Sequence, residues 1–288
     1  MGDGRRLATP AMAITAVALA GCGLGGGSDN GRRQPQRIAA GANHAELKVG
    51  AARSDEGRLL AQVYAQALKA AGYRARVVRG RAGADAWPAS FGGSTDALRS
   101  RLARRGLQAL PPARARLGQG VAVSRARARA LDVEKLSQLE RADDRVRLVA
   151  PRGCGREPAC LPSLRRAYGL RRAFEVRPDL VQATLRAGRA GAAVVSRSDP
   201  HLARDDELLL HDDRHALPAR ALTLVATARA VRAAGPGLAA AARQAGSALS
   251  DAVLAELVAR VTFDEVPPAR AARGYLRAGR LLPPAAGR

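Results

Sequence analysis

The most constraining feature of the sequence is an apolar strand, an amphipathic helix and a second strand that follow one another closely. Leu47–Ala51 is a short segment, apolar except for Lys48, and is predicted to be a strand. Ser54 can cap a helix whose apolar residues recur at helical spacing as far as Ala71. Arg76–Val78 begins a second strand. A strand–helix–strand unit of this kind predicts neighbouring parallel strands in one sheet.

Strands and helices continue to alternate along the rest of the chain. We expect strands at 107–110, 120–124, 146–150, 191–196, 207–210 and 222–226. We expect helices at 94–106, 161–168, 178–185, 237–245, 251–260 and 268–278. This alternation predicts an α/β architecture.

A charged start and a short apolar run open the chain. Two arginines precede the run 7–19, which is shorter than the about 20 residues that span a bilayer and is typical of a secretory signal. Leu19-Ala20-Gly21-Cys22 resembles the bacterial lipobox, which implies cleavage before Cys22 and lipidation of its sulfur. Residues 1–21 would be the signal peptide and 22–46 the lipidated cysteine with a flexible tether. The alternative is an ordinary signal peptide with an incidental cysteine.

The other two cysteines, Cys154 and Cys160, lie in the loop GCGREPAC. A zinc site needs four ligands at pair spacings, which the nearby sequence lacks, and a redox pair is usually CxxC. In an exported chain, two cysteines in a tight loop with glycine and proline predict a local disulfide. The alternative is a pair of free buried thiols.

The chain carries a net charge of +23, from 48 basic and 25 acidic residues. Only Lys48, Lys69 and Lys135 are lysines, and the arginines spread over nearly every predicted element instead of forming one stripe. No zinc finger or RNA-binding aromatic motif accompanies them, so we expect no specific nucleic-acid partner. The charge would attract anionic lipid headgroups. Aromatic residues make up 3% of the chain, so the core must rest on alanine, leucine and valine.

Catalytic and metal-binding signatures are weak or absent. The sequence has no GxSxG, HExxH, Walker A or strand-linked GxGxxG motif. His211 and His215 have the spacing of a metal pair on a helix, but His211 ends a predicted strand and Arg214 would repel a cation. We interpret Asp205–Glu207 as a solvated turn before a strand. The sequence predicts no enzyme, no metal site and no cofactor.

Five segments resemble, in the same order, the osmoprotectant-binding proteins of ABC transporters, of the glycine betaine/carnitine/choline type. They are VGAARSDEGRLLAQVYAQALKAAGYRARV (49–77), LARRGLQALPPARARLGQGVAVS (102–124), GCGREPACLPSLRRAYGL (153–170), SDPHLARDDELLLHDDRHALPA (198–219) and ALSDAVLAELVARVTFDEVPPARAARGYLRAGRLL (248–282). The third segment is similar to the cysteine loop of actinobacterial members. Each segment alone is weak evidence, whereas their shared order together with the lipobox is specific.

The resemblance implies a two-lobed α/β fold of the periplasmic-binding-protein kind (type II), with a ligand cleft between the lobes. Lobe 1 would hold residues 47–125 and 220–288, and lobe 2 would hold 126–219. The resemblance further implies a monomer that captures a small solute, either a quaternary ammonium compound or another polar osmolyte. The lobes would close on the solute by a hinge motion and dock on a membrane permease. The lipid anchor would hold the protein at the outer face of the cell membrane.

Several positions depart from the family's ligand site. The family surrounds a quaternary ammonium group with aromatic rings, whose faces attract a cation. Ser90 stands at the tyrosine position of the PEYTG-like motif, although Gly92 matches it. In the NFPE-like motif that covers Arg53–Glu56, only Glu56 matches. The ligand class implied by the resemblance is therefore less secure than the fold, because the site decides the ligand.

Two further motifs have changed. Glu157, with Arg156 beside it, stands where the family has an arginine that can pair with a ligand carboxylate. The ADN-like motif is Ala219-Arg220-Ala221, whereas Asp199 and Pro200 match the family. Polar side chains could hydrogen-bond a polar solute, with Arg53 or Arg220 pairing an anionic group. The candidate ligand-binding residues are Arg53, Ser54, Glu56, Ser90, Gly92, Gln119, Arg156 and Asp199.

Trp87 and Phe91 are the two aromatic residues nearest to these motifs. They could rebuild part of a cation cage. We favour instead that both pack within lobe 1, because they precede a helix on an apolar path.

Two other functional hypotheses stay open. One is a degenerate binding-protein-like lipoprotein that acts as an interaction or sensing module without transport. The other is a surface protein that binds anions through its bulk charge, which salt-sensitive DNA binding would reveal. Ligand-induced closure of the lobes would separate a transport receptor from the first alternative.

Overall fold

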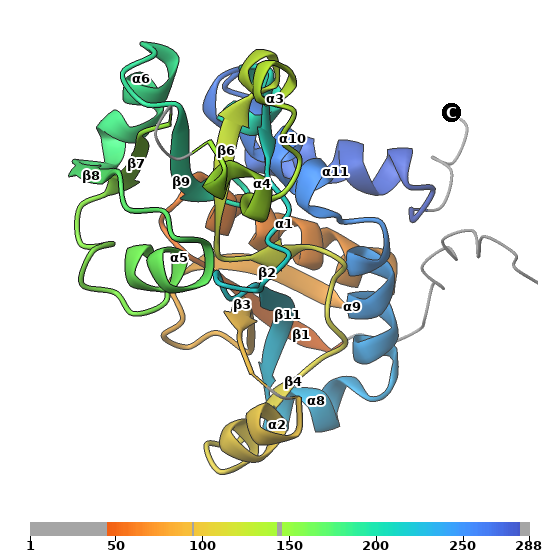
Figure 1. The fold of residues 1–288 in the computed structure, drawn as a ribbon. Helices are drawn as coiled ribbons and strands as arrows, with labels where there is room; N and C mark the ends of the chain where they lie inside the picture. The colour runs from red at the N-terminus through yellow and green to blue at the C-terminus, as the bar shows by residue number, and fades with distance from the viewer. Residues whose placement is uncertain (1–44, 94, 143–145, 283–288) are drawn as a thin grey trace, which may run out of the picture. The chain divides into compact units, whose positions relative to one another are not determined.

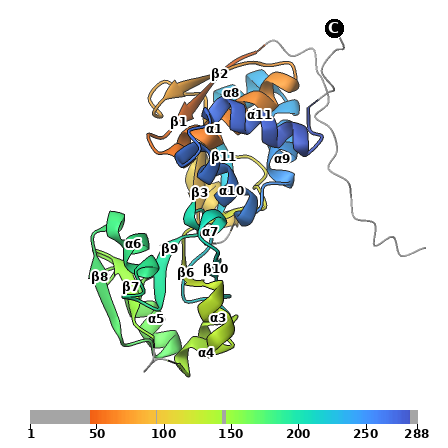
Figure 2. The same ribbon diagram turned by 90° about the horizontal axis from the view of Figure 1, so that it is seen from above.

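The computed structural model describes residues 45–93, 95–142 and 146–282, all of which belong to one compact unit, residues 35–288. They form two β-sheets with helices packed on them (Figure 1). In Figure 2 the elements of the two sheets gather in two separate groups. We call the part built on the first sheet lobe 1 and the part built on the second sheet lobe 2. The predicted signal peptide, Cys22 and nearly all of the tether lie outside the described residues.

Lobe 1 contains a sheet in the order β2-β1-β3-β11-β4, and β5 also pairs with β11. Its strands are β1 (Glu46–Ala51), β2 (Arg74–Arg79), β3 (Ala86–Phe91), β4 (Leu107–Ala109), β5 (Arg116–Leu117) and β11 (Arg220–Thr227). Its helices are α1 (Asp55–Ala70), α2 (Thr95–Ala103), α8 (Ala228–Ala234), α9 (Gly237–Ser247), α10 (Asp251–Thr262) and α11 (Pro268–Ala278). The strands β1 and β2 are parallel, which confirms the predicted strand–helix–strand unit. The sheet as a whole is mixed, because β11 returns from lobe 2 and runs antiparallel to β3, β4 and β5.

The helix α1 shows how local sequence builds lobe 1. Ser54 caps it, since its side-chain oxygen accepts a hydrogen bond from the Gly57 N–H at 3.1 Å. The apolar face predicted for this helix is buried against α9, α10 and α11. Gly72 follows the helix with φ 92°, a conformation that glycine adopts without strain. The predicted start and end of α1 are thus confirmed.

Lobe 2 contains a sheet in the order β10-β6-β9-β7-β8. Its strands are β6 (Gln119–Ser124), β7 (Leu148–Pro151), β8 (Ala173–Val176), β9 (Ala192–Ser196) and β10 (Glu207–Leu209). Its helices are α3 (Arg125–Leu131), α4 (Leu136–Glu140), α5 (Leu161–Tyr168), a 3₁₀ turn (Pro178–Leu180), α6 (Val181–Arg186) and α7 (His201–Arg204). The predicted helix 161–168 is confirmed residue for residue as α5.

The chain passes between the sheets twice. The first passage lies between β5 and β6, at Gly118, and the second lies between β10 and β11. We expected lobe 1 to continue to residue 125, but β6 pairs with β9 and β10 and therefore belongs to the second sheet. At Gly118 (φ 127°) an added Cβ would lie 2.8 Å from the Pro218 carbonyl oxygen, so the two passages run in close contact.

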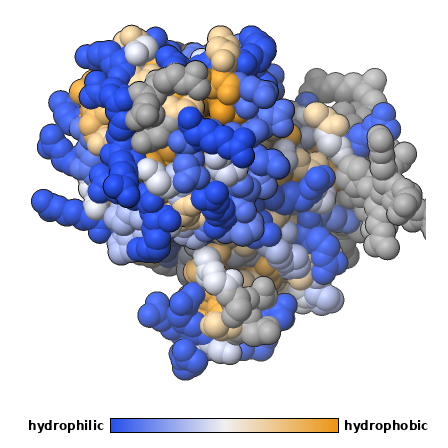
Figure 3. Space-filling view, in the orientation of Figure 1, coloured by the Kyte–Doolittle hydropathy of each residue, from blue (hydrophilic) through white to orange (hydrophobic). Residues whose placement is uncertain are grey.

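The interior of each lobe is made of small and branched apolar side chains. The core of lobe 1 is dominated by leucine, valine and alanine, with Tyr64, Tyr73 and Tyr275 as its aromatic members. Two apolar clusters cover the two faces of the second sheet. The face shown in Figure 3 is mostly hydrophilic, with apolar residues in small separate areas. This surface agrees with arginines that spread over many elements.

Candidate functional site

A cavity of about 430 Å³ is lined by residues of both lobes. Lobe 1 contributes the charged residues Glu56 and Arg220 together with Ser90. Lobe 2 contributes Gln119, Gln182, Ser196 and Asp199, and the valines of β9 and α6 supply apolar wall. A cavity of this size with a few convergent polar groups is typical of a small-molecule site.

Strand ends and helix starts position these polar side chains. Glu56 lies in the first turn of α1, directly after β1. Gln119 and Ser196 are paired residues at the ends of β6 and β9. Arg220 begins β11 and is paired with Leu117 of β5. The two passages between the sheets therefore place Gln119 and Arg220 at the same edge of the cavity.

A chain of hydroxyl groups joins the two lobes at Glu56. The Ser198 hydroxyl donates a hydrogen bond to Oε2 of Glu56. The Ser196 hydroxyl lies 2.9 Å from the Ser198 hydroxyl oxygen. Because Ser198 uses its proton on Glu56, Ser196 must be the donor in this second bond. The donor protons of both serines are then consumed within the protein.

Asp199 is held by the backbone that follows it. Its Oδ1 accepts a hydrogen bond from the His201 N–H at 3.0 Å. The side chain is half-buried and lines the cavity. Among the described residues, no hydrogen bond is made to Oδ2 of Asp199 or to Oε1 of Glu56. Each carboxylate is thus anchored through one oxygen and keeps the other available.

Gln182 and Glu207 form a buried polar pair behind the cavity wall. Gln182 is 8% exposed and Glu207 is 3% exposed. The Gln182 Nε2 group donates to Oε2 of Glu207 at 3.3 Å. Their remaining oxygens, Oε1 of each, are buried without a hydrogen-bond partner among the described residues. The pKa of Glu207 is raised to about 7, chiefly by burial and to a smaller extent by the nearby Asp199 and Asp205.

Four of the eight candidate ligand-binding residues line the cavity, and four do not. Glu56, Ser90, Gln119 and Asp199 are brought together in its wall, as is Arg220. The four others lie outside its lining: Arg53, Ser54, Gly92 and Arg156.

The four residues outside the lining have other surroundings. Arg53 is exposed and its carbonyl accepts from Arg58, while Ser54 caps α1. Gly92 is exposed beside Arg220, whose Cγ would lie 3.6 Å from an added Cβ. Arg156 is exposed in the cysteine loop.

The interpretation of the acidic run 205–207 is wrong for one of its residues. Asp206 is exposed in a turn with φ 51°. Glu207, however, is buried and is the first residue of β10. Gln182 and Ser196 also line the cavity but are not among the residues predicted from the sequence. The one indication for Gln182 is that a polar residue stands on the buried face of α6, next to Val181.

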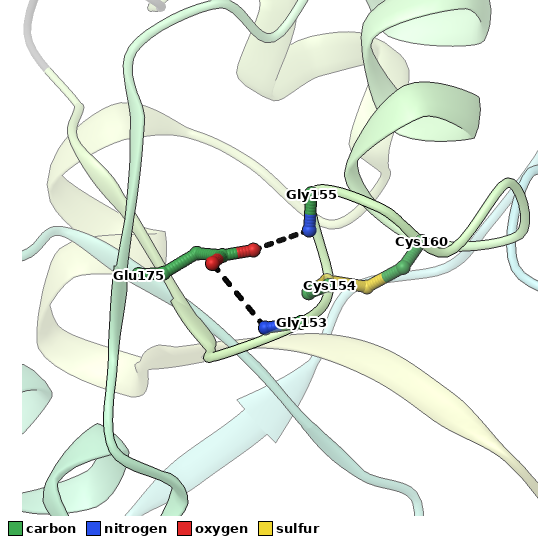
Figure 4. Close-up of a disulfide and its surroundings, with 5 residues drawn as sticks. All are labelled: Gly153, Cys154, Gly155, Cys160 and Glu175. Atoms are coloured by element: carbon green, nitrogen blue, oxygen red, sulfur yellow. Dashed lines mark hydrogen bonds between the residues drawn. A yellow bond between two sulfur atoms is a disulfide. The ribbon is translucent and has the colours of Figure 1, made fainter.

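Cys154 and Cys160 are joined by a disulfide, with their Cα atoms 5.3 Å apart. Both cysteines are buried. The Gly153 N–H donates to Glu175 at 3.2 Å, and the Gly155 N–H donates to the same carboxylate (Figure 4). These two backbone bonds hold the pKa of Glu175 below its usual range. The loop thus folds around a carboxylate that β8 supplies.

The histidine pair is not arranged as a metal site. His211 takes part in an isolated bridge with Lys135, and His215 adopts φ 54° in a turn. Across the described residues, no group of three or more histidine, cysteine or acidic side chains could hold a metal ion. In the same part of the chain, no helix has both the length and the apolar character needed to cross a membrane.

The fold and the cavity define a class: two α/β lobes, each on its own sheet, with a polar ligand-sized cavity lined by both. A family model described as the substrate-binding domain of the ABC-type glycine betaine transport system matches residues 45–278. The chain belongs to this family. Its members are substrate-binding parts of a transporter and not a family of enzymes. No curated protein sequence matches the chain.

Solved structures share the fold at low sequence identity. Apo YehZ from Escherichia coli is 18% identical with a TM-score of 0.69, over 81% of this chain and 98% of that one. A glycine betaine/carnitine/choline ABC transporter structure is 14% identical with a TM-score of 0.73, over 83% and 99%. Lactococcal OpuAC, closed on glycine betaine, is 11% identical with a TM-score of 0.54, over 82% and 96%. These similarities confirm the predicted two-lobed fold.

Proposed function

We propose that this chain is the solute receptor of an ABC importer, which binds a small polar solute between its lobes and presents it to a membrane permease. The observation that carries the proposal is the 430 Å³ cavity, to which both lobes contribute polar side chains. The family of the chain serves substrate binding in glycine betaine transport, and a structure with the same fold holds glycine betaine in a closed conformation.

Binding through both lobes favours closure. Glu56, Ser90 and Arg220 belong to lobe 1, whereas Gln119, Gln182 and Asp199 belong to lobe 2. A solute that contacts both sets binds a closed arrangement more tightly than an open one, and so shifts the population toward it. Closure is what would distinguish loaded from empty receptor at the permease.

The test is thermal unfolding of residues 23–288, with the disulfide intact, against a panel of solutes. The panel contains glycine betaine, carnitine, choline, ectoine, amino acids and small anions. A solute at 100 times its dissociation constant should stabilise the protein by about 2.7 kcal/mol. Failure of every solute, including cell extract fractions of low molecular mass, would contradict the receptor function.

We also propose that the receptor is a monomer anchored outside the cell membrane. The supports are the apolar run 7–19, the lipobox that ends at Cys22 and the glycines that follow it. Replacement of Cys22 by serine (Cys22→Ser) should release the protein from the membrane fraction, while the unchanged protein stays there after a high-salt wash. Retention of the serine variant in washed membranes would show that lipidation is not the anchor.

A further inference from the structure

We infer that the solute is a small zwitterion whose cationic nitrogen carries at least one N–H, and whose anionic group lies at Arg220. This inference rests on the proposed function and specifies its ligand. It is drawn from the groups that line the cavity and keep hydrogen-bonding capacity: one oxygen each of the Glu56 and Asp199 carboxylates as acceptors, and the guanidinium group of Arg220.

The part of the cavity near Glu56 and Asp199, where we place the cationic nitrogen of the solute, offers hydrogen-bond acceptors and few donors. Glu56 and Asp199 each use one oxygen within the protein and keep one oxygen available. The protons of Ser196 and Ser198 are already donated to the protein, so these hydroxyls cannot serve an anion there. Half-buried carboxylate oxygens of this kind are satisfied by a ligand that donates hydrogen bonds.

A quaternary ammonium group would leave these acceptors unsatisfied, because it has no N–H. Proteins bind that group chiefly through the faces of aromatic rings. The chain has eight aromatic residues (one Trp, four Tyr and three Phe), and the structure describes all of them. None of the eight lines the cavity.

Trp87 and Phe91 are the aromatic residues closest in sequence to the cavity residue Ser90, and neither lines the cavity. Trp87 and Phe91 lie on β3, half-buried, on either side of Ser90 and outside the cavity lining. The Trp87 ring has the guanidinium carbon of Arg81 at 5.9 Å from its centroid. Arg81 thus lies over one face of the Trp87 ring. The cavity therefore recognises a cation by charge and hydrogen bonding.

Arg220 supplies the opposite charge. It lines the cavity at the start of β11, and among the described residues its guanidinium group has no ion-pair partner. A guanidinium group binds a carboxylate through two parallel hydrogen bonds. Ser90 and Gln119, which line the same cavity, can add donors to that carboxylate. The cavity then holds a carboxylate at Arg220 and an ammonium group between Glu56 and Asp199.

The experiment compares ligands in which N-methyl groups replace the N–H groups one at a time. L-proline, N-methyl-L-proline and proline betaine share ring and carboxylate, and their cationic nitrogens carry two, one and no N–H. Sarcosine, dimethylglycine and glycine betaine form a second series. Isothermal titration should give affinities that fall along each series, with the quaternary member at least about tenfold weaker than the first.

Variants locate the effect in the cavity. Asp199→Asn should lower the affinity ratio of L-proline to proline betaine, because one of the two anionic acceptors is lost while Glu56 remains. Asp132→Asn is the matched control: Asp132 is exposed at the end of α3, with φ 52°, where asparagine is tolerated. Arg220→Gln should weaken L-proline about tenfold or more and leave pyrrolidine, which lacks the carboxylate, unchanged.

Each outcome decides between the inference and the proposed function. Affinities that fall with N–H count support both. Betaines that bind as tightly as their N–H-bearing analogues, or a solute with no ammonium group, overturn the inference and leave the receptor function standing. If neither series nor any other solute of the panel binds, both are overturned.

Discussion

Glu207 is a carboxyl group that the fold buries with an amide as its hydrogen-bond partner. It is 3% exposed, and Gln182 donates to it. Burial raises its pKa from an ordinary value of 4.5 to about 7, since the charged form loses its hydration. A raised pKa means that folding favours the protonated form. The resulting stabilisation is complete below about pH 4.5 and is lost as the pH rises through 7.

The isosteric variant Glu207→Gln tests this assignment, because glutamine cannot ionise and still accepts from Gln182. At pH 8 the variant should be more stable than the unchanged protein, by up to about 3 kcal/mol for a shift of this size. The difference should shrink toward pH 4.5. Urea unfolding at several pH values measures it, with the exposed neighbour change Asp206→Asn as control. A difference in unfolding free energy that does not vary with pH would show that the pKa of Glu207 is not raised.

Glu175 has the opposite behaviour. Two backbone N–H groups of the cysteine loop, from Gly153 and Gly155, bind its carboxylate and lower its pKa. A lowered pKa gives stabilisation that is present above about pH 4.5 and is lost as the pH falls through the folded-state pKa. Glu175→Gln should therefore lower the melting temperature by more at pH 7 than at pH 3. Glu157→Gln, at an exposed position of the same loop, is the matched control. If Glu175→Gln lowered the melting temperature equally at both pH values, the Glu175 carboxylate would not be the source of the stabilisation.

At the scale of single elements, the cap of α1 can be tested directly. The Ser54 side chain accepts from the Gly57 N–H, which would otherwise be unpaired at the helix start. Ser54→Ala should destabilise the protein by about 1 kcal/mol in denaturant unfolding. Ser100→Ala, on the exposed face of α2, should have almost no effect or stabilise slightly. Equal effects of the two changes would mean that the cap contributes nothing.

Most of the longer elements could be predicted from the sequence, and the strand β3 shows why one of them was missed. α1, α5 and α11 have helical apolar spacing and clear caps or stops, and their positions are confirmed. The strand β3 was not predicted, because Pro88 cannot donate to a ladder and usually argues against a strand. Antiparallel pairing with β11 from Phe91 to Ala86 supports β3 nonetheless. That partner lies more than a hundred residues away, so local pattern does not reveal it.

The same reasoning applies to the site. Glu56, Ser90, Gln119 and Asp199 were placed near a cleft through the family resemblance, and all four line the cavity. Gln182 and Glu207 were not recognised, since a buried polar pair depends on which faces of α6 and β10 meet. Only the three-dimensional arrangement shows that Oε1 of Gln182 is without a partner. The local sequence cannot report an unsatisfied atom.

For the whole molecule, Asp251 is one of the side chains that connect the two lobes. It begins α10 of lobe 1. Its Oδ1 accepts from the Arg116 N–H at 2.6 Å, and its Oδ2 lies 2.7 Å from Nη2 of Arg197, which follows β9 of lobe 2. Both partners of the ion pair are about one quarter exposed. The ion pair therefore stabilises the fold more than a fully solvated ion pair would.

Asp251→Ala should destabilise the protein by about 1–3 kcal/mol, because an N–H and a guanidinium group lose their acceptor. Thermal unfolding measures the loss. Glu256→Ala, at an exposed position of the same helix, should change the melting temperature little. If both variants melt alike, the contact between Asp251 and Arg197 does not contribute to joining the lobes.

The late position of β11 in the chain has a consequence for synthesis. All five strands of lobe 2, up to Leu209, leave the ribosome before β11 begins at Arg220. Until then β3, β4 and β5 lack the strand with which they mainly pair. The continuous lobe can fold as soon as it emerges, whereas the split lobe must wait with unpaired strand edges, the form of a chain most prone to aggregate. In whichever compartment the chain folds, all strands of the second lobe precede β11 in the sequence, and the sheet of the first lobe is complete only with the last quarter of the protein.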